Sequence, residues 1–334
     1  MKPQPNSRIT KVLSVPHMAV RQIDKLNRHR IGERGKRALE GFRQYRDSIG
    51  VRSWNIQRGV EPQSSTVSCL TNPTACGSEA STKRLKLLSF NIQVGIETHR
   101  YRHYFTRGWK HFLPHEARQN NLREIADVVG DFDLVALQEV DVGSIRSGFV
   151  NQVEYLAAEA SFPYWYSQRN RNLGPIAQHG NGLLSRVEPH LLEDHKLPGT
   201  LPGRGAIVMK FCFGETEVMV VLLHLSLGKR SQETQLEYVR DLLEEHPHAV
   251  VMGDMNSHLN RLLFDSPLAD TSLRPAEDVQ PTYPSWQPAV ALDHVLVSPG
   301  LEIENYEVLD CRLSDHRPIA VSIGLRQENS PRLQ

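Results

Sequence analysis

The sequence predicts an α/β fold in which mixed β-sheets are covered by helices. Strand-like and helix-like segments alternate along most of the chain, which is typical of α/β proteins. Two neighbouring apolar runs, 206–213 and 217–225, flank Gly214 and Glu215 and predict a β-hairpin, so part of the strand pairing is antiparallel. No Gly-rich phosphate-binding loop is recognisable. These features argue against an all-parallel Rossmann sheet.

Strands are expected where short apolar runs end in polar or turn residues. They are predicted at residues 85–93, 132–140, 163–168, 182–185, 206–213, 217–225, 249–252, 291–298, 303–309 and 319–323. Helices with one apolar side are predicted at residues 115–129, 147–160 and 232–245. The stretch from the end of the 249–252 strand to about residue 290 is expected to be rich in loops.

Composition divides the chain into three parts. Residues 1–83 are predicted to be a basic extension and linker, because 19–45 contains helical patterns broken by glycines and 61–83 is rich in Ser, Thr, Gly and Pro. Residues 84–325 are predicted to form the folded domain, with a short tail at 326–334. The whole chain of 334 residues, 39% hydrophobic and 23% charged, can bury a sizeable core.

The charge of the chain is unevenly distributed. Fourteen Lys and Arg against four Asp and Glu give residues 1–60 a net charge of +10, which leaves −9 for the other 274 residues of a chain that totals +1. The basic extension could contact an anionic membrane or a nucleic acid. The alternative is a solvated, weakly ordered arm, because its apolar stripe is interrupted.

The cysteines and the apolar runs bear on localisation. Cys212 and Cys311 lie in strand-like runs and are expected to be buried thiols, and no metal-ligand spacing is present, so a reducing compartment is the default. No run approaches the ~20 apolar residues of a membrane span. A cytoplasmic protein without a transmembrane segment is expected. The Arg-rich start leaves an organellar transit peptide as the alternative.

In residues 249–256, polar side chains directly follow a predicted buried strand. The apolar run 249–252 predicts a buried strand, and Gly253 allows a sharp turn and a close backbone approach. Asp254 and Asn256 follow at alternate positions, so their side chains can point the same way. A capped turn is the ordinary explanation of such residues, and the rest of the chain must decide between turn and site.

Five other segments place polar side chains at or beside strand ends in the same manner. The six segments together contribute Asn91, Glu139, His224, Asp254 with Asn256, Asp293, and Asp315 with His316. Any one of them could be a turn or a surface residue, but together they offer hard oxygen ligands and two imidazoles. Such ligands favour Mg²⁺ or Mn²⁺ over structural zinc and suit the hydrolysis of phosphate esters. His294 would face away from this group, because neighbours in a strand alternate in direction.

These segments resemble the endonuclease/exonuclease/phosphatase superfamily, which has the deoxyribonuclease-I-like fold. The matching motifs, in the order of the family, are Leu88-Ser89-Phe90-Asn91, Leu137-Gln138-Glu139-Val140, His224-Leu225, Gly253-Asp254-Met255-Asn256, Leu292-Asp293-His294-Val295 and Ser314-Asp315-His316. The resemblance covers about residues 84–325. It implies a four-layer α/β sandwich: two mixed sheets face to face, helices outside, and a site at one edge.

The resemblance also implies roles for the matching residues. Glu139 would be the principal metal ligand, and Asn91 and Asp315 would complete or flank the metal shell. Asp254 would orient or deprotonate the attacking water. Asn256 would hydrogen-bond the scissile phosphate.

Two histidines and two further residues complete the predicted site. His316 would contact the phosphate, with Asp293 fixing its tautomer and supporting its positive charge. His224 would be a second phosphate-facing imidazole and a candidate for protonating the leaving group. Asn181 resembles a residue that approaches the substrate, and Arg204 resembles an arginine near the cleft, although a surface-loop arginine is the alternative.

The predicted function is a Mg²⁺-dependent (or Mn²⁺-dependent) phosphodiesterase. Its phosphate-ester substrate could be a nucleic acid, a phospholipid or a small phosphodiester. The acidic balance of the domain counts against a dedicated duplex-DNA nuclease. Residues 282–288 look more like small bacterial hydrolases, sphingomyelinase-like members and lipid-anchor remodelling proteins, so a lipid phosphodiesterase at a membrane surface is one alternative. A DNA or RNA endonuclease is another alternative. The complete set of motifs argues against a non-catalytic binding protein.

Overall fold

The structure is a computed structural model that describes residues 84–95, 116–173, 176–199 and 203–326. The predicted basic extension and linker at 1–83 lie outside the described residues, as do residues 327–334 of the predicted tail. No helix in the described stretches is long and apolar enough to cross a membrane.

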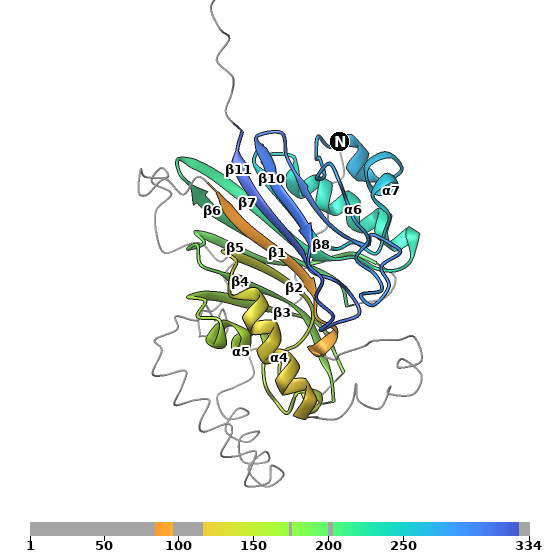
Figure 1. The fold of residues 1–334 in the computed structure, drawn as a ribbon. Coiled ribbons are helices and arrows are strands. Elements are labelled where there is room, and N and C mark those ends of the chain that lie inside the picture. The colour runs from red at the N-terminus through yellow and green to blue at the C-terminus, as the bar shows by residue number, and fades with distance from the viewer. Residues whose placement is uncertain (1–83, 96–115, 174–175, 200–202, 327–334) are drawn as a thin grey trace, which may run out of the picture. The chain divides into compact units, whose positions relative to one another are not determined.

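Two β-sheets form the centre of the described fold (Figure 1). The first has the order β10-β11-β1-β2-β4-β3 and consists of β10 (Leu301–Val308), β11 (Ile319–Leu325), β1 (Leu85–Asn91), β2 (Leu134–Asp141), β4 (Gln178–Ser185) and β3 (Tyr164–Asn172). The second has the order β5-β6-β7-β8-β9 and consists of β5 (Leu191–Lys196), β6 (Gly205–Phe213), β7 (Thr216–His224), β8 (Ala249–Asp254) and β9 (Asp293–Val297).

Both sheets are mixed. Each contains one parallel pair, β1 with β2 and β7 with β8, and all other pairs are antiparallel. The hairpin predicted around Gly214 is confirmed as β6 and β7, which pair from Phe213 with Thr216 to Ala206 with Leu223. The prediction of mixed sheets is therefore correct.

Four layers follow from where the apolar side chains are buried. The facing sides of the two sheets share one core, with side chains such as Leu87 from β1 and Met252 from β8. A second core lies between the first sheet and two helices, and a third lies between the second sheet and α6. In Figure 1, α4 (yellow) and α6 (teal) lie on opposite sides of the strands. The predicted four-layer α/β sandwich is confirmed.

The helices match the predicted pattern in part. They are α4 (Glu116–Val129), α5 (Gln152–Glu159), α6 (Lys229–Leu243) and α7 (Leu259–Phe264), with 3₁₀ turns η1 (Gln93–Gly95), η3 (Ile145–Ser147) and η4 (Pro267–Asp270). The helix predicted from residue 147 begins later, because Asn151 caps α5 by accepting hydrogen bonds from the backbone N–H of Val153 and Glu154. The stretch predicted to be rich in loops also contains the short helix α7 and the turn η4.

In the second sheet one strand was missed and the prediction for one cysteine is wrong. The edge strand β5 was not predicted, because in Leu-Leu-Glu-Asp-His-Lys only Leu192 is buried and the apolar signal is weak. Cys212, expected to be a buried thiol, is exposed on β6 and takes part in a disulfide bond. Cys311 is a free, half-buried cysteine, and burial raises the pKa of its thiol.

Candidate active site

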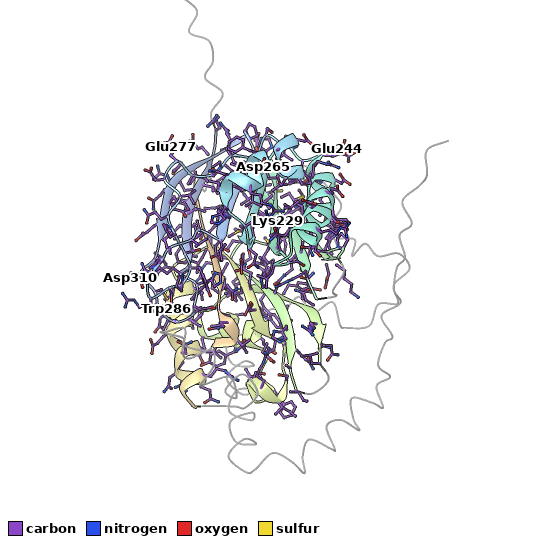
Figure 2. The ribbon with its side chains drawn as sticks, turned by 90° about the vertical axis from the view of Figure 1, so that its right-hand side faces the viewer. Lys229, Glu244, Asp265, Glu277, Trp286 and Asp310 are labelled. Carbon is purple, nitrogen blue, oxygen red and sulfur yellow. The ribbon has the colours of Figure 1, made fainter. Side chains whose placement is uncertain are left out.

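The strand registers bring the predicted polar residues to one edge of the two sheets. Asn91 at the end of β1 lies opposite Gln138 of β2, the residue before Glu139. In the second sheet, His224 pairs with Asp254 and Asp254 pairs with Asp293 across β7, β8 and β9. Figure 2 shows this side of the molecule, with Lys229 at the start of α6 labelled. Residues far apart in the sequence thus meet at the ends of adjacent strands.

Two backbone features direct side chains into the site. The pairing of β2 with β4 is interrupted between Leu137 and Val140, and within this bulge Glu139 has a left-handed φ of 56°. The bulge turns the Glu139 side chain out of the regular alternation. Gly253 has a φ of 144°, and a Cβ there would lie 1.9 Å from the backbone oxygen of Leu223. Only glycine fits, which confirms the close backbone approach predicted before Asp254.

Asp254 joins the two sheets at the centre of the site. Its Oδ2 accepts a hydrogen bond from Nδ2 of Asn91 at 3.0 Å, and its Oδ1 accepts one from the backbone N–H of Asn256 at 3.0 Å. The same Oδ2 lies 3.4 Å from Nε2 of His224 and 3.9 Å from Nε2 of His316. The carboxylate is therefore surrounded by donors and imidazoles, with only 1% of the residue exposed.

Burial and charge set the protonation of Asp254. The pKa of Asp254 is raised to about 7 because burial, with the charge of Asp293 adding to it, outweighs the positive charge of His316 and the hydrogen bond from Asn91. A carboxylate that gains and loses its proton near neutral pH suits a general base.

His316 and Asp293 form a buried, charged pair. Nδ1 of His316 lies 2.7 Å from Oδ2 of Asp293, which also accepts a hydrogen bond from the Thr282 hydroxyl at 2.6 Å. Burial alone would lower the pKa of His316, but Asp293 and then Asp254 outweigh it and raise the pKa well above its usual value. His316 is therefore an imidazolium at neutral pH, with its Nε2–H directed toward Asp254.

Glu139 and Asp315 supply a pair of like charges. Burial raises the pKa of Glu139, and the nearby carboxylate of Asp315 raises it further, while His316 and Arg204 act in the opposite direction. Two facing carboxylates repel each other unless a cation or a proton lies between them. This donor set fits a divalent cation that prefers oxygen ligands.

The side-chain amide of Asn91 is oriented to donate hydrogen bonds, whereas Glu139 and Asp315 offer oxygen atoms to a metal ion. Its amide NH₂ donates to Asp254, and its Oδ1 accepts the backbone N–H of Gln93 at 3.1 Å. An amide binds a cation through its oxygen, and that oxygen is engaged with the backbone. Hydrogen bonding from Asn91 also lowers the pKa of Glu139. In this geometry Asn91 orients the carboxylates as a donor.

A second group of potential ligands lies at the same edge. Asp254, Asp293 and His316 each offer an atom within 4.8 Å of the others, the distance range of a metal site. However, the short contact between His316 and Asp293 uses Nδ1 of the imidazole and an oxygen of the carboxylate. Their close approach is explained by the ion pair itself, so Glu139 with Asp315 is the stronger candidate for a cation.

Arg204 and His224 are also brought into the site. Nη1 of Arg204 lies 2.7 Å from Nδ1 and 2.6 Å from Nε2 of His224. A guanidinium can only donate, so the ring nitrogen that it contacts must accept, and the imidazole is neutral. Burial and the charge of Arg204 lower the pKa of His224 well below its usual value. His224 is thus suited to hydrogen bonding and poorly suited to protonating a leaving group at neutral pH.

The remaining predicted residues differ in their access to the site. Asn256 is half-buried and donates from Nδ2 to the backbone oxygen of Leu225 at 3.0 Å. Asn181 is fully buried, and its amide donates to Gln168 and to the backbone oxygen of Gly205, next to Arg204. His294 points away, with Nε2 2.8 Å from the backbone oxygen of Ser257, as the strand alternation predicted.

Three basic residues beside the site were not predicted from the sequence. They are Arg146 in η3, Arg171 on β3 and His179 on β4, and the last two face each other in the register of β3 and β4. The arginines carry no sequence signal that distinguishes them from surface arginines. His179 lies two residues before Asn181, which was predicted, and that proximity was the only available signal.

Comparison with known proteins agrees with this geometry. Residues 88–316 match the Endonuclease/Exonuclease/phosphatase family, whereas no curated protein matches the sequence. A solved endonuclease/exonuclease/phosphatase from Beutenbergia cavernae is 20% identical, with a TM-score of 0.58 over 73% of this chain and 72% of that chain. A mannosyl-6-phosphatase from Bacteroides thetaiotaomicron is 17% identical, with a TM-score of 0.52 over 72% and 99%. The human Nocturnin catalytic domain with bound sulfate is 14% identical, with a TM-score of 0.54 over 73% and 94%.

The solved structures share the fold of this chain, and the sequence match includes strands of both sheets and every predicted catalytic position from Asn91 to His316. The chain belongs to the endonuclease/exonuclease/phosphatase family.

Proposed function

We propose that this protein is a phosphodiesterase that depends on Mg²⁺ or Mn²⁺. Members of its family are phosphoester hydrolases and generally depend on a divalent metal. The observation that carries the proposal is the arrangement around Asp254. A buried carboxylate with a raised pKa faces an imidazolium, His316, that is held by a second carboxylate, Asp293. A base and a fixed positive charge at one point suit the attack of water on a phosphate.

The cation would be held by Glu139 and Asp315. Burial and then repulsion by Asp315 raise the pKa of Glu139, and a divalent cation would relieve that repulsion. When bound, such a cation offsets the negative charge of the phosphate group and of the departing ester oxygen. Asn91 would keep Glu139 and Asp254 in place through its amide NH₂.

The protein side chains supply the other functions. Asp254 would take a proton from the attacking water, and the second N–H of the Asn256 amide would bind the phosphate. His316 would stabilise the growing negative charge on the phosphate through its Nε2–H. His224, neutral and held by Arg204, would act as a hydrogen-bond donor beside Asp254.

Hydrolysis of bis-p-nitrophenyl phosphate tests this proposal. We expect the full chain to hydrolyse it with Mg²⁺ or Mn²⁺ and to lose the activity when EDTA is added. Asp254→Asn and His316→Gln should each lower kcat by about 10²–10⁴-fold, the usual range for a general base or for a charge that stabilises the transition state.

A matched control is available at the other end of the second sheet. His190 contacts Glu217 near the start of β7, at the end of that strand remote from His224. His190→Gln should therefore leave kcat unchanged. Equal rates in wild type, Asp254→Asn and His316→Gln, or a rate that does not respond to EDTA, would exclude the proposed chemistry.

A further inference from the structure

A cluster of cationic groups lies beside the catalytic carboxylates. We call Arg146, Arg171, Arg204 and His179 the arginine cluster. Arg146 is 3% exposed, and its Nε donates to Oδ2 of Asp141 at 2.8 Å. Its Nη1 lies 3.1 Å from Nε2 of His179, and its Nη2 is buried without a hydrogen-bond partner among the described residues. The guanidinium is therefore only partly satisfied by its protein neighbours.

Arg146 fixes the tautomer of His179. Because a guanidinium has donors only, Nε2 of His179 must accept, and the proton of the neutral imidazole is on Nδ1. Burial and the charge of Arg146 lower the pKa of His179 to about 4, with Arg171 and Arg204 adding to the effect. His179 is thus a neutral N–H donor at physiological pH. Within the described residues, no group accepts a hydrogen bond from Nδ1.

Arg171 on β3 lies next to the segment that contains Arg204, the residue immediately before β6. Gly203, with a φ of 121°, precedes Arg204, and a Cβ built on it would lie 3.2 Å from Cβ and 3.4 Å from Cδ of Arg171. The Arg171 stem therefore packs over the residue before Arg204. Arg171 also lowers the pKa of Arg204, whereas Glu139 and Asp254 raise it. Arg204 connects the cluster to the catalytic carboxylates.

One guanidinium of the cluster, that of Arg171, has no acidic partner among the described residues. Asp141 pairs with Arg146, and the carboxylates of Glu139 and Asp254 lie close enough to raise the pKa of Arg204, whereas none of the described acidic residues forms an ion pair with Arg171. An unpaired guanidinium, in the same cluster as the unsatisfied Nη2 of Arg146, favours the binding of an anion. Guanidinium forks match phosphate oxygens, and a phosphate monoester carries up to two negative charges at neutral pH.

We propose that the arginine cluster is a second anion subsite, and that the substrate is a phosphodiester carrying an additional phosphate monoester group. Arg171, Arg204 and Nδ1–H of His179 contact this group, and the more deeply buried Arg146 holds His179 from behind. The phosphate to be cleaved then lies at Asp254 and His316, with Arg204 between the two positions. This assignment of substrate class rests on the proposed phosphodiesterase function.

Binding of inorganic phosphate tests the subsite without turnover. Isothermal titration calorimetry of the full chain in EDTA should show one phosphate per chain. Arg171→Gln should weaken this binding about 10-fold, the value of a charge-assisted hydrogen bond. Arg171 is exposed, so the variant is expected to fold. Arg169→Gln removes an exposed arginine of the same strand outside the cluster and should bind phosphate as the wild type does.

His316→Gln distinguishes the two phosphate positions. If phosphate occupies the arginine cluster, this variant retains the binding. No phosphate binding by the wild type, equal binding by wild type and Arg171→Gln, or loss of binding in His316→Gln would each overturn the proposal. Failure to hydrolyse any phosphodiester would instead contradict the proposed function, while the calorimetry would still report on the subsite.

Substrate preference supplies the second measurement. Thymidine 5′-(p-nitrophenyl phosphate) is compared with the same compound carrying a 3′-phosphate. We expect the additional phosphate to lower KM about 10-fold in the wild type and in Arg169→Gln, and to have little effect in Arg171→Gln. A wild-type KM that is the same for both compounds would contradict a subsite for a second phosphate of this substrate.

Discussion

Asp254 is the point at which groups from both sheets meet, and its environment determines what it can do. It accepts a hydrogen bond from Asn91 of the first sheet while lying beside His224 of the second sheet and His316 of the loop before β11. In water a carboxylate would be fully ionised at neutral pH, but burial raises the pKa of Asp254 to about 7. The same burial strengthens its interaction with the His316 imidazolium.

The partner of His316 can be tested by substitution. Asp293→Asn keeps the shape of the side chain and removes the charge that raises the pKa of His316. His316 is charged below its pKa, so a lower pKa should move the high-pH decline of kcat to lower pH. We expect kcat at neutral pH to fall about 10²–10⁴-fold. The pH profile of kcat for bis-p-nitrophenyl phosphate measures both effects.

The exposed Asp278 provides the control for this substitution. Asp278→Asn should reproduce the wild-type pH profile. A lower kcat in Asp293→Asn with no movement of the high-pH limb would show that Asp293 acts only by holding the fold.

Residue chemistry determined how much of the site the sequence could predict. Asp254, Asp293 and His316 were predicted because acidic residues and histidines at the ends of buried strands have few structural explanations. Arg146 and Arg171 were not predicted, because an arginine in a loop or on an outer strand resembles any surface arginine. The orientation of the Asn91 amide also required coordinates, since it depends on the Gln93 backbone.

At the scale of elements, the loop after β2 is organised around one carboxylate. Asp141 is fully buried and accepts hydrogen bonds from Ser144, both backbone and hydroxyl, from the Ser147 hydroxyl and from Arg146. Burial alone would raise the pKa of Asp141, but the hydrogen bonds of Ser144 and the charge of Arg146 outweigh it and hold the pKa below its usual value. This carboxylate keeps Arg146 against His179.

Asp141→Asn should destabilise the fold by roughly 3 kcal/mol at pH 7, because it leaves the buried Arg146 without its counter-charge. The pKa of Asp141 is lower in the folded chain than in the unfolded chain, where it is roughly 4. The ionised carboxylate therefore stabilises the fold fully at pH values above roughly 4. This stabilisation is lost as the pH falls through the pKa of the folded chain. The difference between wild type and variant should therefore shrink below roughly pH 4. Urea unfolding at a series of pH values measures it.

Asp131, which is exposed, gives the matched control. Asp131→Asn should leave the free energy of unfolding nearly unchanged. If Asp141→Asn were as stable as the wild type at pH 7, the hydrogen bonds around Asp141 would not be what holds this loop.

The elements that the sequence predicted well are those with a continuous apolar signal. β8 and the β6–β7 hairpin are buried along nearly their whole length, so their apolar runs are unambiguous. The edge strand β5 and the short helix α7 each bury few side chains, and their pattern is close to that of a loop. The β2 bulge at Glu139 was not predicted, because it follows from the pairing with β4.

At the scale of the whole molecule, the site depends on the packing of one sheet against the other. Asn91 and Glu139 come from the first sheet, and His224, Asp254 and Asp293 come from the second. The shared core, with residues from Leu85 to Ile323, sets the distance between the two sheets. Any change that shifts one sheet relative to the other should therefore reduce activity before it unfolds the chain.

The basic extension is proposed to act outside the chemistry. Within the part of the chain that the structure describes, residues from Leu85 onward form three apolar cores, and a chain of residues 84–334 is expected to retain the site. We expect it to hydrolyse bis-p-nitrophenyl phosphate with the kcat/KM of the full chain, because this small ester needs no attraction by the +10 charge of residues 1–60. Since Cys212 is disulfide-bonded, both chains are compared with a reductant present. A large loss of kcat/KM in a shortened chain that unfolds cooperatively would show that residues 1–83 contribute to the active site.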